Sequence, residues 1–347
     1  MTDIATLGEF GLIDRLTQDI ELMQPSSILG CGDDAAVVSY PQGMQTVVTT
    51  DLLLEGVHFD LTYTPLKHLG YKAAVVNFSD VVAMNAKPRQ IIVAIGLSSR
   101  FGVEQVEELY SGIRTACAAY GVDLVGGDTT ASLNGLTISI TCIGELEPDR
   151  ISKRSGAKPT DLICVSGNLG AAYMGLQLLE REKTVFEGME RSEDFQPAFE
   201  GKEYLIERQL KPEARIDIIE MLRREQILPT SMIDISDGLS SELLHIAHSS
   251  QVGVRIYEDR IPIDYQTALM AEEFNLNVVT AALNGGEDYE LLFTAPLALA
   301  DKLQNLQDIH LIGHVTEASL GCALVTRDQK EITLQAQGWQ AYHSDEY

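Results

Sequence analysis

The sequence has few cysteines, and none of them forms a CxxC pair. The five are Cys31, Cys117, Cys142, Cys164 and Cys322. A disulfide framework or a zinc site is therefore not expected, because both need closely spaced or numerous cysteines. Scattered thiols of this kind are typical of a reducing compartment, so we expect a cytoplasmic protein.

Long hydrophobic runs are also missing. No apolar stretch approaches the roughly 18 to 20 residues that a membrane-spanning helix needs. The N-terminal segment MTDIATLGEFGLIDRL has acidic residues near its start and no continuous apolar core. The sequence therefore predicts neither a membrane span nor a signal peptide.

Basic residues are scarce relative to acidic ones. The chain has 25 Lys and Arg against 51 Asp and Glu, which gives a formal net charge of −26. A field of this sign repels DNA, RNA and anionic lipid surfaces. We therefore expect neither a nucleic acid nor a membrane as a partner.

Hydrophobic patterns alternate along the chain between the period of strands and that of helices. Strands are predicted at 46–50, 91–97, 136–143, 161–165 and 231–235. Helices are predicted at 65–86, at 103–120, after Pro212 and at 238–249, the last with Ser236 or Asp237 as its cap. This alternation predicts an α/β protein.

The length and one polar segment predict two domains. A chain of 347 residues is long for a single domain. The basic segment 149–160, DRISKRSGAKPT, contains Gly156 and Pro159 and has the composition of a linker. We place the boundary there, which gives domains 1–148 and 149–347.

Several acidic residues follow an apolar run and small residues. They are Asp33 and Asp34, Asp51, Asp128, Asp234 and Asp237, and Glu287 and Asp288. Ligands bind at strand ends in α/β sheets, and glycine lets a backbone approach a phosphate closely. The alternative is that each motif is only a tight turn, because Gly and Asp are favoured turn residues. Five such motifs in one chain favour a functional site.

Converging carboxylates need a counter-charge. Two unit charges about 4 Å apart repel by about 4 kcal/mol at an effective dielectric near 20. Lys and Arg are scarce near these motifs, so we expect Mg²⁺, which uses one or two carboxylates and completes its shell with water and phosphates. The P-loop, Rossmann and EF-hand patterns are absent. The turn SGNLG at 166–170 is either an anion site or a structural turn.

Eight motifs in order carry a resemblance to a known family. They are GEFGLID (8–14), GDDAAV (32–37), TTDLLLEGVHF (49–59), NFSDVVAMNAKP (77–88), GGDTT (126–130), RSGAKPTD (154–161), DISDGL (234–239) and GGEDYELLF (285–293). In these motifs the chain resembles the thiamine-monophosphate kinases, within the superfamily of aminoimidazole ribonucleotide synthetase and selenophosphate synthetase. The resemblance implies two α/β domains of the aminoimidazole ribonucleotide synthetase-like fold. It also implies a homodimer in which the N-terminal domains, which bind ATP and Mg²⁺, pair into a β-barrel.

The resemblance implies a reaction and a set of residues. The reaction is ATP-dependent phosphorylation of thiamine monophosphate to thiamine diphosphate. Implied ligands of several Mg²⁺ ions are Asp34, Thr50, Asp51, Asp80, Asp128, Asp234 and Asp237, of which Asp51, Asp128 and Asp234 would be catalytic. Implied ATP contacts are Tyr110, Gly127, Asp128, Arg154 and Ser236. Implied contacts with thiamine monophosphate are His58, Glu287 and Trp339.

The chain departs from the family pattern at Cys31, at Asn85, where the family favours Gly, and in its C-terminal GWQAY. Two alternative functions stay open. One is another ATP-dependent member of the superfamily, although a selenophosphate synthetase would need a reactive cysteine in a different context from that of Cys31. The other is a non-catalytic sensor of Mg²⁺ and nucleotide, which would have no need for the acceptor contacts His58 and Glu287.

Overall fold

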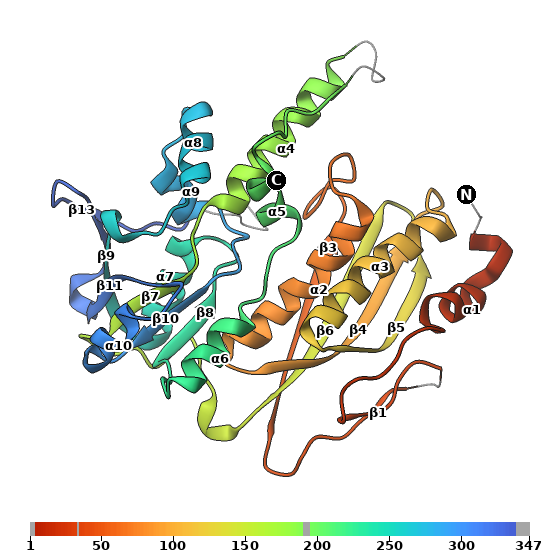
Figure 1. The fold of residues 1–347 in the computed structure, drawn as a ribbon, viewed down its shortest axis with the longest axis horizontal. Coiled ribbons are helices and arrows are strands. Elements are labelled where there is room, and N and C mark those ends of the chain that lie inside the picture. Colours follow the sequence, from red (N-terminus) through yellow and green to blue (C-terminus); the bar gives the residue numbers. More distant parts are fainter. Residues whose placement is uncertain (1–3, 33–34, 190–194, 338–347) are drawn as a thin grey trace. The chain divides into compact units, whose positions relative to one another are not determined.

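The chain folds into two compact units, Met1–Ile151 and Ser152–Tyr347 (Figure 1). The structure, a computed structural model, describes residues 4–32, 35–189 and 195–337. The sequence-based boundary was placed after residue 148, and the structure divides the chain after Ile151. Within these described ranges, no helix combines the length and the apolar character that crossing a bilayer requires.

The first unit is a four-stranded sheet with helices packed against it. Its elements are α1 (Ile4–Thr17), β1 (Ser27–Leu29), β2 (Val37–Val38), β3 (Gln45–Leu54), α2 (Leu66–Ala83), β4 (Lys87–Leu97), α3 (Val103–Tyr120), β5 (Asp123–Ala131), β6 (Leu136–Leu146) and the short η1 (Pro148–Arg150). The sheet has the order β3-β6-β4-β5, in which only β4 and β5 run parallel. Helix α2 contacts β3, β4 and β6.

The two faces of this sheet differ in burial. Side chains alternate between faces along a strand, and Val93, Ile138 and Ile140 on the helix-covered face are fully buried. On the opposite face, Val48 is 62% exposed and Leu52 is 54% exposed. The first unit therefore presents an uncovered sheet face that carries apolar side chains.

Helices α2 and α3 contact each other through their backbones. A Cβ placed on Gly70 would lie 2.0 Å from the carbonyl oxygen of Leu109, and one on Gly112 would lie 1.9 Å from that of Lys67. Glycine is required at both positions because any side chain would force the helices apart. This contact fixes the position of α2, which is buried along almost its whole length.

Asn85 explains where α2 ends. The helix stops at Ala83, earlier than the predicted 86, because Asn85 adopts the left-handed conformation with φ of 62°. Asn tolerates this conformation better than other residues with a Cβ, and its Nδ2 donates to the carbonyl oxygen of Arg150 at 2.8 Å. The left-handed backbone accounts for the glycine that the family favours here.

The second unit is a seven-stranded sheet of order β13-β12-β9-β11-β7-β10-β8. Its strands are β7 (Leu162–Ser166), β8 (Ser231–Asp234), β9 (Val252–Tyr257), β10 (Leu291–Ala295), β11 (Ile309–Glu317), β12 (Cys322–Val325) and β13 (Glu331–Thr333). Its helices are α4 (Ala171–Glu187), α5 (Glu203–Leu210), α6 (Ile216–Arg224), α7 (Leu239–Ser250), α8 (Tyr265–Glu273), α9 (Val278–Asn284) and α10 (Ala300–Gln304), with short η3 (Glu258–Arg260), η4 (Leu297–Leu299) and η5 (Ala318–Leu320). Of the strand pairs described, only β9 and β12 run parallel.

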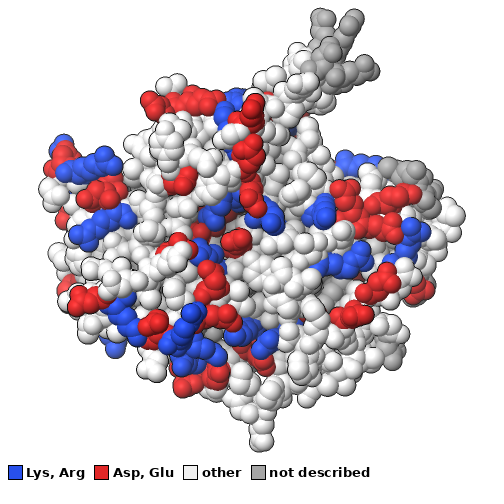
Figure 2. Space-filling model, in the orientation of Figure 1, with Lys and Arg blue, Asp and Glu red and all other residues white. Residues whose placement is uncertain are grey.

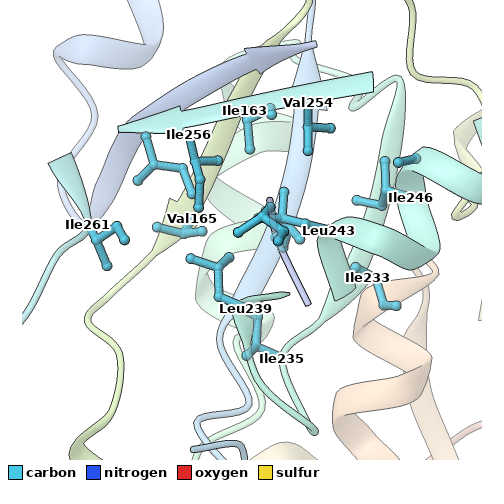
Figure 3. Close-up of a cluster of buried hydrophobic side chains, with 14 of the residues drawn as sticks. Ile163, Val165, Ile233, Ile235, Leu239, Leu243, Ile246, Val254, Ile256 and Ile261 are labelled. Atoms are coloured by element: carbon cyan, nitrogen blue, oxygen red, sulfur yellow. The ribbon is translucent and has the colours of Figure 1, made fainter. Parts of the chain in front are cut away.

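The core of the second unit lies between α7 and the sheet. Leu239, Leu243 and Ile246 of α7 point into a cluster with side chains from the strands, including Ile163 and Val254 (Figure 3). A second cluster joins α4, α5, α8 and α9. The helix α7 follows directly after the loop 235–238, which begins where β8 ends at Asp234, so this packing also holds that loop in place.

Most predicted elements are confirmed, and two details besides the end of α2 are wrong. The predicted strands correspond to β3, β4, β6, β7 and β8, and the helix at 103–120 matches α3. Pro212 does not open a helix, because α6 begins at Ile216, after Arg215. Neither Ser236 nor Asp237 caps α7, because Gly238 with φ of 125° occupies the N-cap position and no side chain caps the helix.

Acidic and basic side chains are interspersed on the face shown in Figure 2. Several bases lie in exposed ion pairs, such as Arg181 and Lys202, which both contact Glu273. Exposed pairs of this kind contribute little to stability. They do reduce the positive charge that these side chains present to a polyanion.

The glycine contact predicts that Gly112→Ala destabilises the protein by about 1–3 kcal/mol, because the added methyl would overlap the carbonyl of Lys67. The change is measured as the midpoint of urea unfolding. Gly188→Ala is the control, since its added methyl would meet its nearest atom at an ordinary 3.4 Å. Equal midpoints for Gly112→Ala and the unchanged protein would contradict the backbone contact.

Candidate active site

Asp51 and Asp80 lie close together on the helix-covered face of the first unit. Asp51 is in β3, where its backbone N–H donates to Oδ1 of Asn77 at 3.1 Å, and Thr49 donates through Oγ1 to Oδ2 of Asp80 at 2.6 Å. Burial, and then the charge of Asp80, raise the pKa of Asp51 to about 6. The fold thus brings two carboxylates near enough to repel each other.

Thr50 and Asp128 lie on the other, uncovered face. Thr50 pairs with Thr141, and Asp128 in β5 pairs with Ala94. Both Thr50 and Asp128 are exposed. The predicted metal ligands of the first unit are therefore divided between the two faces of its sheet.

The expectation that these acids stand at strand ends is wrong for Asp51 and Asp128. Both lie within their strands, β3 and β5, and the sheet is mixed, whereas the strand-end rule applies to parallel α/β sheets. Gly127, beside Asp128, allows the neighbouring strand to approach, because a Cβ there would lie 2.1 Å from the carbonyl oxygen of Val93. Asp234 does end its strand, β8.

His58 and Tyr110 are the other predicted site residues that the structure describes in the first unit. His58 is exposed in the turn after β3, and its Nδ1 accepts the backbone N–H of Leu54 at 3.0 Å. Tyr110 of α3 is only 5% exposed, so its contact with a nucleotide base stays a prediction. Asp34 in the first unit and Trp339 in the second lie outside the described residues.

Two loops of the second unit are joined by backbone hydrogen bonds. The first loop is 235–238 and the second is 285–290, and we call them the paired loops. The N–H of Glu287 donates to Ser236 at 2.6 Å, that of Tyr289 to Ile235 at 2.9 Å, and that of Ile235 to Glu290 at 2.8 Å. These bonds bring Glu287 beside the segment that contains Asp234, Ser236 and Asp237.

The paired loops need an uncommon backbone conformation. Glu287 and Tyr289 are both left-handed, with φ of 57° and 52°, which is unfavourable for residues that have a Cβ. Gly286 is left-handed as well, and a Cβ on it would lie 2.6 Å from the carbonyl oxygen of Ser236. Strain of this kind persists only where the surrounding structure imposes it, and it is commonest at functional sites.

The side chains around the paired loops include acids and a few bases. Oε2 of Glu287 accepts a hydrogen bond from Gln209 at 2.7 Å. Burial raises the pKa of Asp237, while the positive charges of His245 and Arg154 lower it. The structure therefore brings five of the predicted residues into one region, namely Arg154, Asp234, Ser236, Asp237 and Glu287.

Asp288 has a structural role. It is 1% exposed, and its carboxylate accepts the backbone N–H groups of Gly170 at 2.8 Å and Ala172 at 3.4 Å, at the start of α4. Arg208 lies 3.8 Å from it. The SGNLG turn is thus confirmed as structural, because a carboxylate of the protein already occupies the N-terminus of the helix that follows.

Arginine also reaches Glu290, which is buried next to the same loop. Arg208 lies 3.1 Å from Glu290, and Arg215 forms a second, short ion pair with it. The expectation that Lys and Arg are scarce near the acidic motifs is therefore wrong for the GGEDYE motif. The bases are supplied by α5 and by the N-cap of α6, which are distant in sequence.

No group of three or more His, Cys, Asp or Glu is arranged to hold a metal ion among the residues that the structure describes. Of the carboxylates predicted as ligands, Asp51 and Asp80 form a pair in one unit, and Asp234 and Asp237 lie in one segment of the other. Asp128 lies apart from Asp51, on the opposite face of the same sheet. Carboxylate oxygens are the ligands that Mg²⁺ prefers, and it often takes only one or two from a protein. Both sets fit Mg²⁺ that is also bound to phosphates.

Comparisons with known proteins decide the family. AIR synthase related protein, N-terminal domain, matches residues 32–146, and AIR synthase related protein, C-terminal domain, matches 159–325. Thiamine-monophosphate kinase from Aquifex aeolicus is 36% identical over 90% of this chain and 92% of its own length. The enzyme of the same name from Bacillus subtilis is 32% identical over 96% and 99%. The chain belongs to the thiamine-monophosphate kinase family.

Solved structures agree with this membership. AaThiL complexed with AMPPCP and TMP is 34% identical, has a TM-score of 0.74 and is covered over 99% of both chains. A structure of the hydrogenase maturation protein HypE in complex with ATP has a TM-score of 0.72 at 21% identity, a likeness that concerns the fold alone. The resemblance to thiamine-monophosphate kinases is thereby confirmed, together with a two-domain α/β fold.

Three residues that position the acidic side chains of the site were not predicted from the sequence. Asn77 is fully buried on α2, accepts the N–H of Asp51 and donates to the carbonyl of Ala73 at 3.0 Å. A polar residue inside an apolar helix was the available signal, since Asn77 begins the NFSDVVAMNAKP motif. Arg208 and Arg215 gave no comparable signal, because their partners lie about 80 residues away in the chain.

The raised pKa of Asp51 predicts that Asp51→Asn stabilises the metal-free protein. Asp51 ionises near pH 6 when folded and near its ordinary value of 3.8 when unfolded. The unchanged protein should therefore lose stability as pH rises from about 4 to about 6, whereas the variant does not. The measurement is the Tm of both proteins in EDTA across this range.

The Tm advantage of Asp51→Asn should grow up to about pH 6 and stay constant above it. Thr49→Val is a suitable companion variant, because it removes the hydrogen bond to Asp80 and leaves the charge of Asp51 in place. An Asp51→Asn protein that is no more stable than the unchanged one at pH 7.5 would show that neither burial nor the charge of Asp80 disfavours the ionised Asp51.

Proposed function

We propose that the protein transfers the γ-phosphoryl group of ATP to thiamine monophosphate, giving ADP and thiamine diphosphate, the last step of thiamine diphosphate biosynthesis. The observation that carries this proposal is the full-length likeness to AaThiL, which was solved with AMPPCP and TMP. The protein is accordingly an ATP-dependent kinase whose acceptor is itself a phosphate. The eight motifs that carry the resemblance all lie within the region that this relative covers.

The residues fall into roles that follow from their chemistry. Asp51, Asp80, Asp128, Asp234 and Asp237 would hold Mg²⁺, with Thr50 and Asp34 as further ligands, and Mg²⁺ would neutralise charge on the transferring phosphates. Arg154 would bind a phosphate, since guanidinium pairs with two of its oxygens. Tyr110, Gly127 and Ser236 complete the proposed ATP contacts.

His58, Glu287 and Trp339 are the proposed contacts with thiamine monophosphate. Its phosphate has a second pKa near 6, so at neutral pH its oxygen is already largely deprotonated. A protein base has little proton to remove, and His58 would orient the acceptor. The main barrier is repulsion between two anionic phosphates, which positioning and bound cations offset. Direct in-line transfer without a phosphorylated enzyme follows from this.

A homodimer is part of the proposal. In the first unit, β3 is a ten-residue edge strand, and the sheet face beside it carries exposed Val48, Leu52 and Ile92. Long, apolar sheet edges are normally covered. A second copy that pairs along this face would build the barrel that the resemblance implies, and it would place Thr50 and Asp128 next to a partner.

The cytoplasm is the proposed place of action. All five cysteines are free thiols, and Cys117, Cys142 and Cys164 are buried. Burial raises the pKa of each of these three thiols. Such thiols are unreactive and typical of a protein that is kept in a reducing compartment.

The activity is tested directly with purified protein. With ATP and Mg²⁺ it should convert thiamine monophosphate to thiamine diphosphate and release ADP in equal amount, and it should phosphorylate free thiamine poorly. Asp51→Asn and Asp128→Asn should each lower turnover by about a hundredfold or more, because each removes an anionic ligand near the transferring phosphoryl group. Thiamine phosphates are separated and quantified by chromatography.

Efficient use of thiamine with no use of its monophosphate would overturn the substrate assignment. ADP release that thiamine monophosphate does not stimulate would favour another ATP-dependent member of the superfamily with a different acceptor, and nucleotide binding without turnover would favour a sensor. Glu272→Gln, in the exposed part of α8, serves as a charge control. A labelled protein after incubation with γ-labelled ATP alone would exclude direct transfer.

The sheet face predicts that Leu52→Arg halves the mass of the protein in solution, because a charge on the uncovered face would prevent pairing of two copies. The mass is measured by light scattering after gel filtration. Leu297→Arg is the matched control, since Leu297 is similarly exposed at 57% but lies in the second unit. A dimer that survives Leu52→Arg unchanged would place the interface elsewhere.

A further inference from the structure

Glu242 lies in the first turn of α7, just after the loop that carries Asp234 and Asp237. It is only 1% exposed, although its side chain is a carboxylate. Its Oε1 accepts the backbone N–H of Asp237 at 3.3 Å. The helix has no side-chain cap at Gly238, so Glu242 is the side chain that reaches back from the helix to this loop.

The second carboxylate oxygen of Glu242 is unsatisfied. Oε2 is buried and has no hydrogen-bond partner among the described residues. Both oxygens are bonded to one carbon, so Oε2 also lies beside the loop. An unsatisfied buried acceptor destabilises the folded protein, because it has lost its hydrogen bonds to water. The free protein therefore maintains an unfavourable group at this position, next to two residues that are proposed to bind Mg²⁺.

The charges around Glu242 add to this cost. The two carboxylates of Asp237 and Asp234 act on Glu242 with negative charge. Asp237 is in turn acted on by the positive charges of His245 and Arg154. A carboxylate that served only to hold the loop would be better replaced by a neutral acceptor. A ligand with positive charge and hydrogen-bond donors would offset both the negative charge and the unsatisfied oxygen.

We propose that Glu242 is a positioning residue for a divalent cation at Asp234 and Asp237. Oε1 fixes the backbone of Asp237, and Oε2 accepts a hydrogen bond from a water molecule of the cation's hydration shell. This inference rests on the proposed function, in which these two aspartates hold Mg²⁺. Mg²⁺ retains several of its waters when bound, and outer-shell acceptors of this kind orient the inner ligands.

Glu242→Gln tests the role of one carboxylate oxygen without removing the other. The variant keeps an amide oxygen for the N–H of Asp237 and replaces the other acceptor with an NH₂ donor. The probe is Mn²⁺, titrated calorimetrically into the full chain in the presence of AMPPCP. We expect Mn²⁺ affinity to fall about 10- to 100-fold, with no loss of Tm in EDTA. In the kinase assay, half-maximal activity should need more Mg²⁺, while kcat at saturating Mg²⁺ changes little.

Glu182→Gln is the matched control. Glu182 is also buried, at 7% exposed, and its Oε2 also accepts a backbone N–H, that of Ala198 at 3.0 Å. Its partner is Arg181 instead of an acid, so this variant should bind Mn²⁺ like the unchanged protein. Wild-type Mn²⁺ affinity in Glu242→Gln would overturn the proposal.

Glu242→Asp provides a second test, which is decisive if the Gln variant does not fold. It retains the charge but withdraws the carboxylate by one methylene, so Mn²⁺ affinity should fall here too, and wild-type affinity would again overturn the proposal. The role of Glu242 and the proposed function are tested by different results. Loss of Mn²⁺ binding in these variants supports the role of Glu242 even if thiamine monophosphate is not phosphorylated, a result that would overturn only the proposed function.

Discussion

Repulsion between buried carboxylates is the constraint on which both units depend. In the second unit, Asp288 and Glu290 are neutralised by Arg208 and Arg215, and they stabilise the fold. Asp51 and Glu242 differ, because burial raises their pKa values and the neighbouring charges that act on them come from other carboxylates, which raise them further. The protein thus contains two kinds of acidic residue: those that pair with arginine and stabilise the fold, and those whose neighbouring charges are also negative. The second kind is what a cation-binding site requires before the cation arrives.

Much of the fold could be predicted from the sequence because the determining signals are local. The helix at 103–120 has one apolar face and ends at the left-handed Gly121, and its bounds match the prediction. The start of α6 could not be predicted in the same way. Pro212 is well suited to a first helical turn, yet Arg215 is held by Glu290 and Asp217, and the helix begins only after it. Arg215 and Glu290 are 75 residues apart in the sequence, so a local pattern cannot predict their ion pair.

The chemistry of the site was predictable, but its geometry was not. Acidic residues that follow apolar runs pointed to the segments around Asp51, Asp128 and Asp234. Which face of the sheet each side chain occupies depends on strand register, and Asp51 and Asp128 lie on opposite faces. The supporting groups depend on contacts between distant segments. Gly286 illustrates this, because its need for glycine arises from the carbonyl of Ser236, which belongs to a different loop.

The glycine contact between α2 and α3 affects the position of residues outside the contact itself. Because Gly70 and Gly112 let the backbones touch, α2 can neither slide along its neighbour nor turn about its own axis without a clash. Asn77 and Asp80 lie on the same helix, two to three turns after Gly70, and face β3. The spacing between Asp51 and Asp80 is therefore set by two residues that have no side chain and take no part in chemistry. Over evolutionary time, the acids should be able to tolerate new neighbours more easily than this pair of helices could tolerate one additional carbon atom.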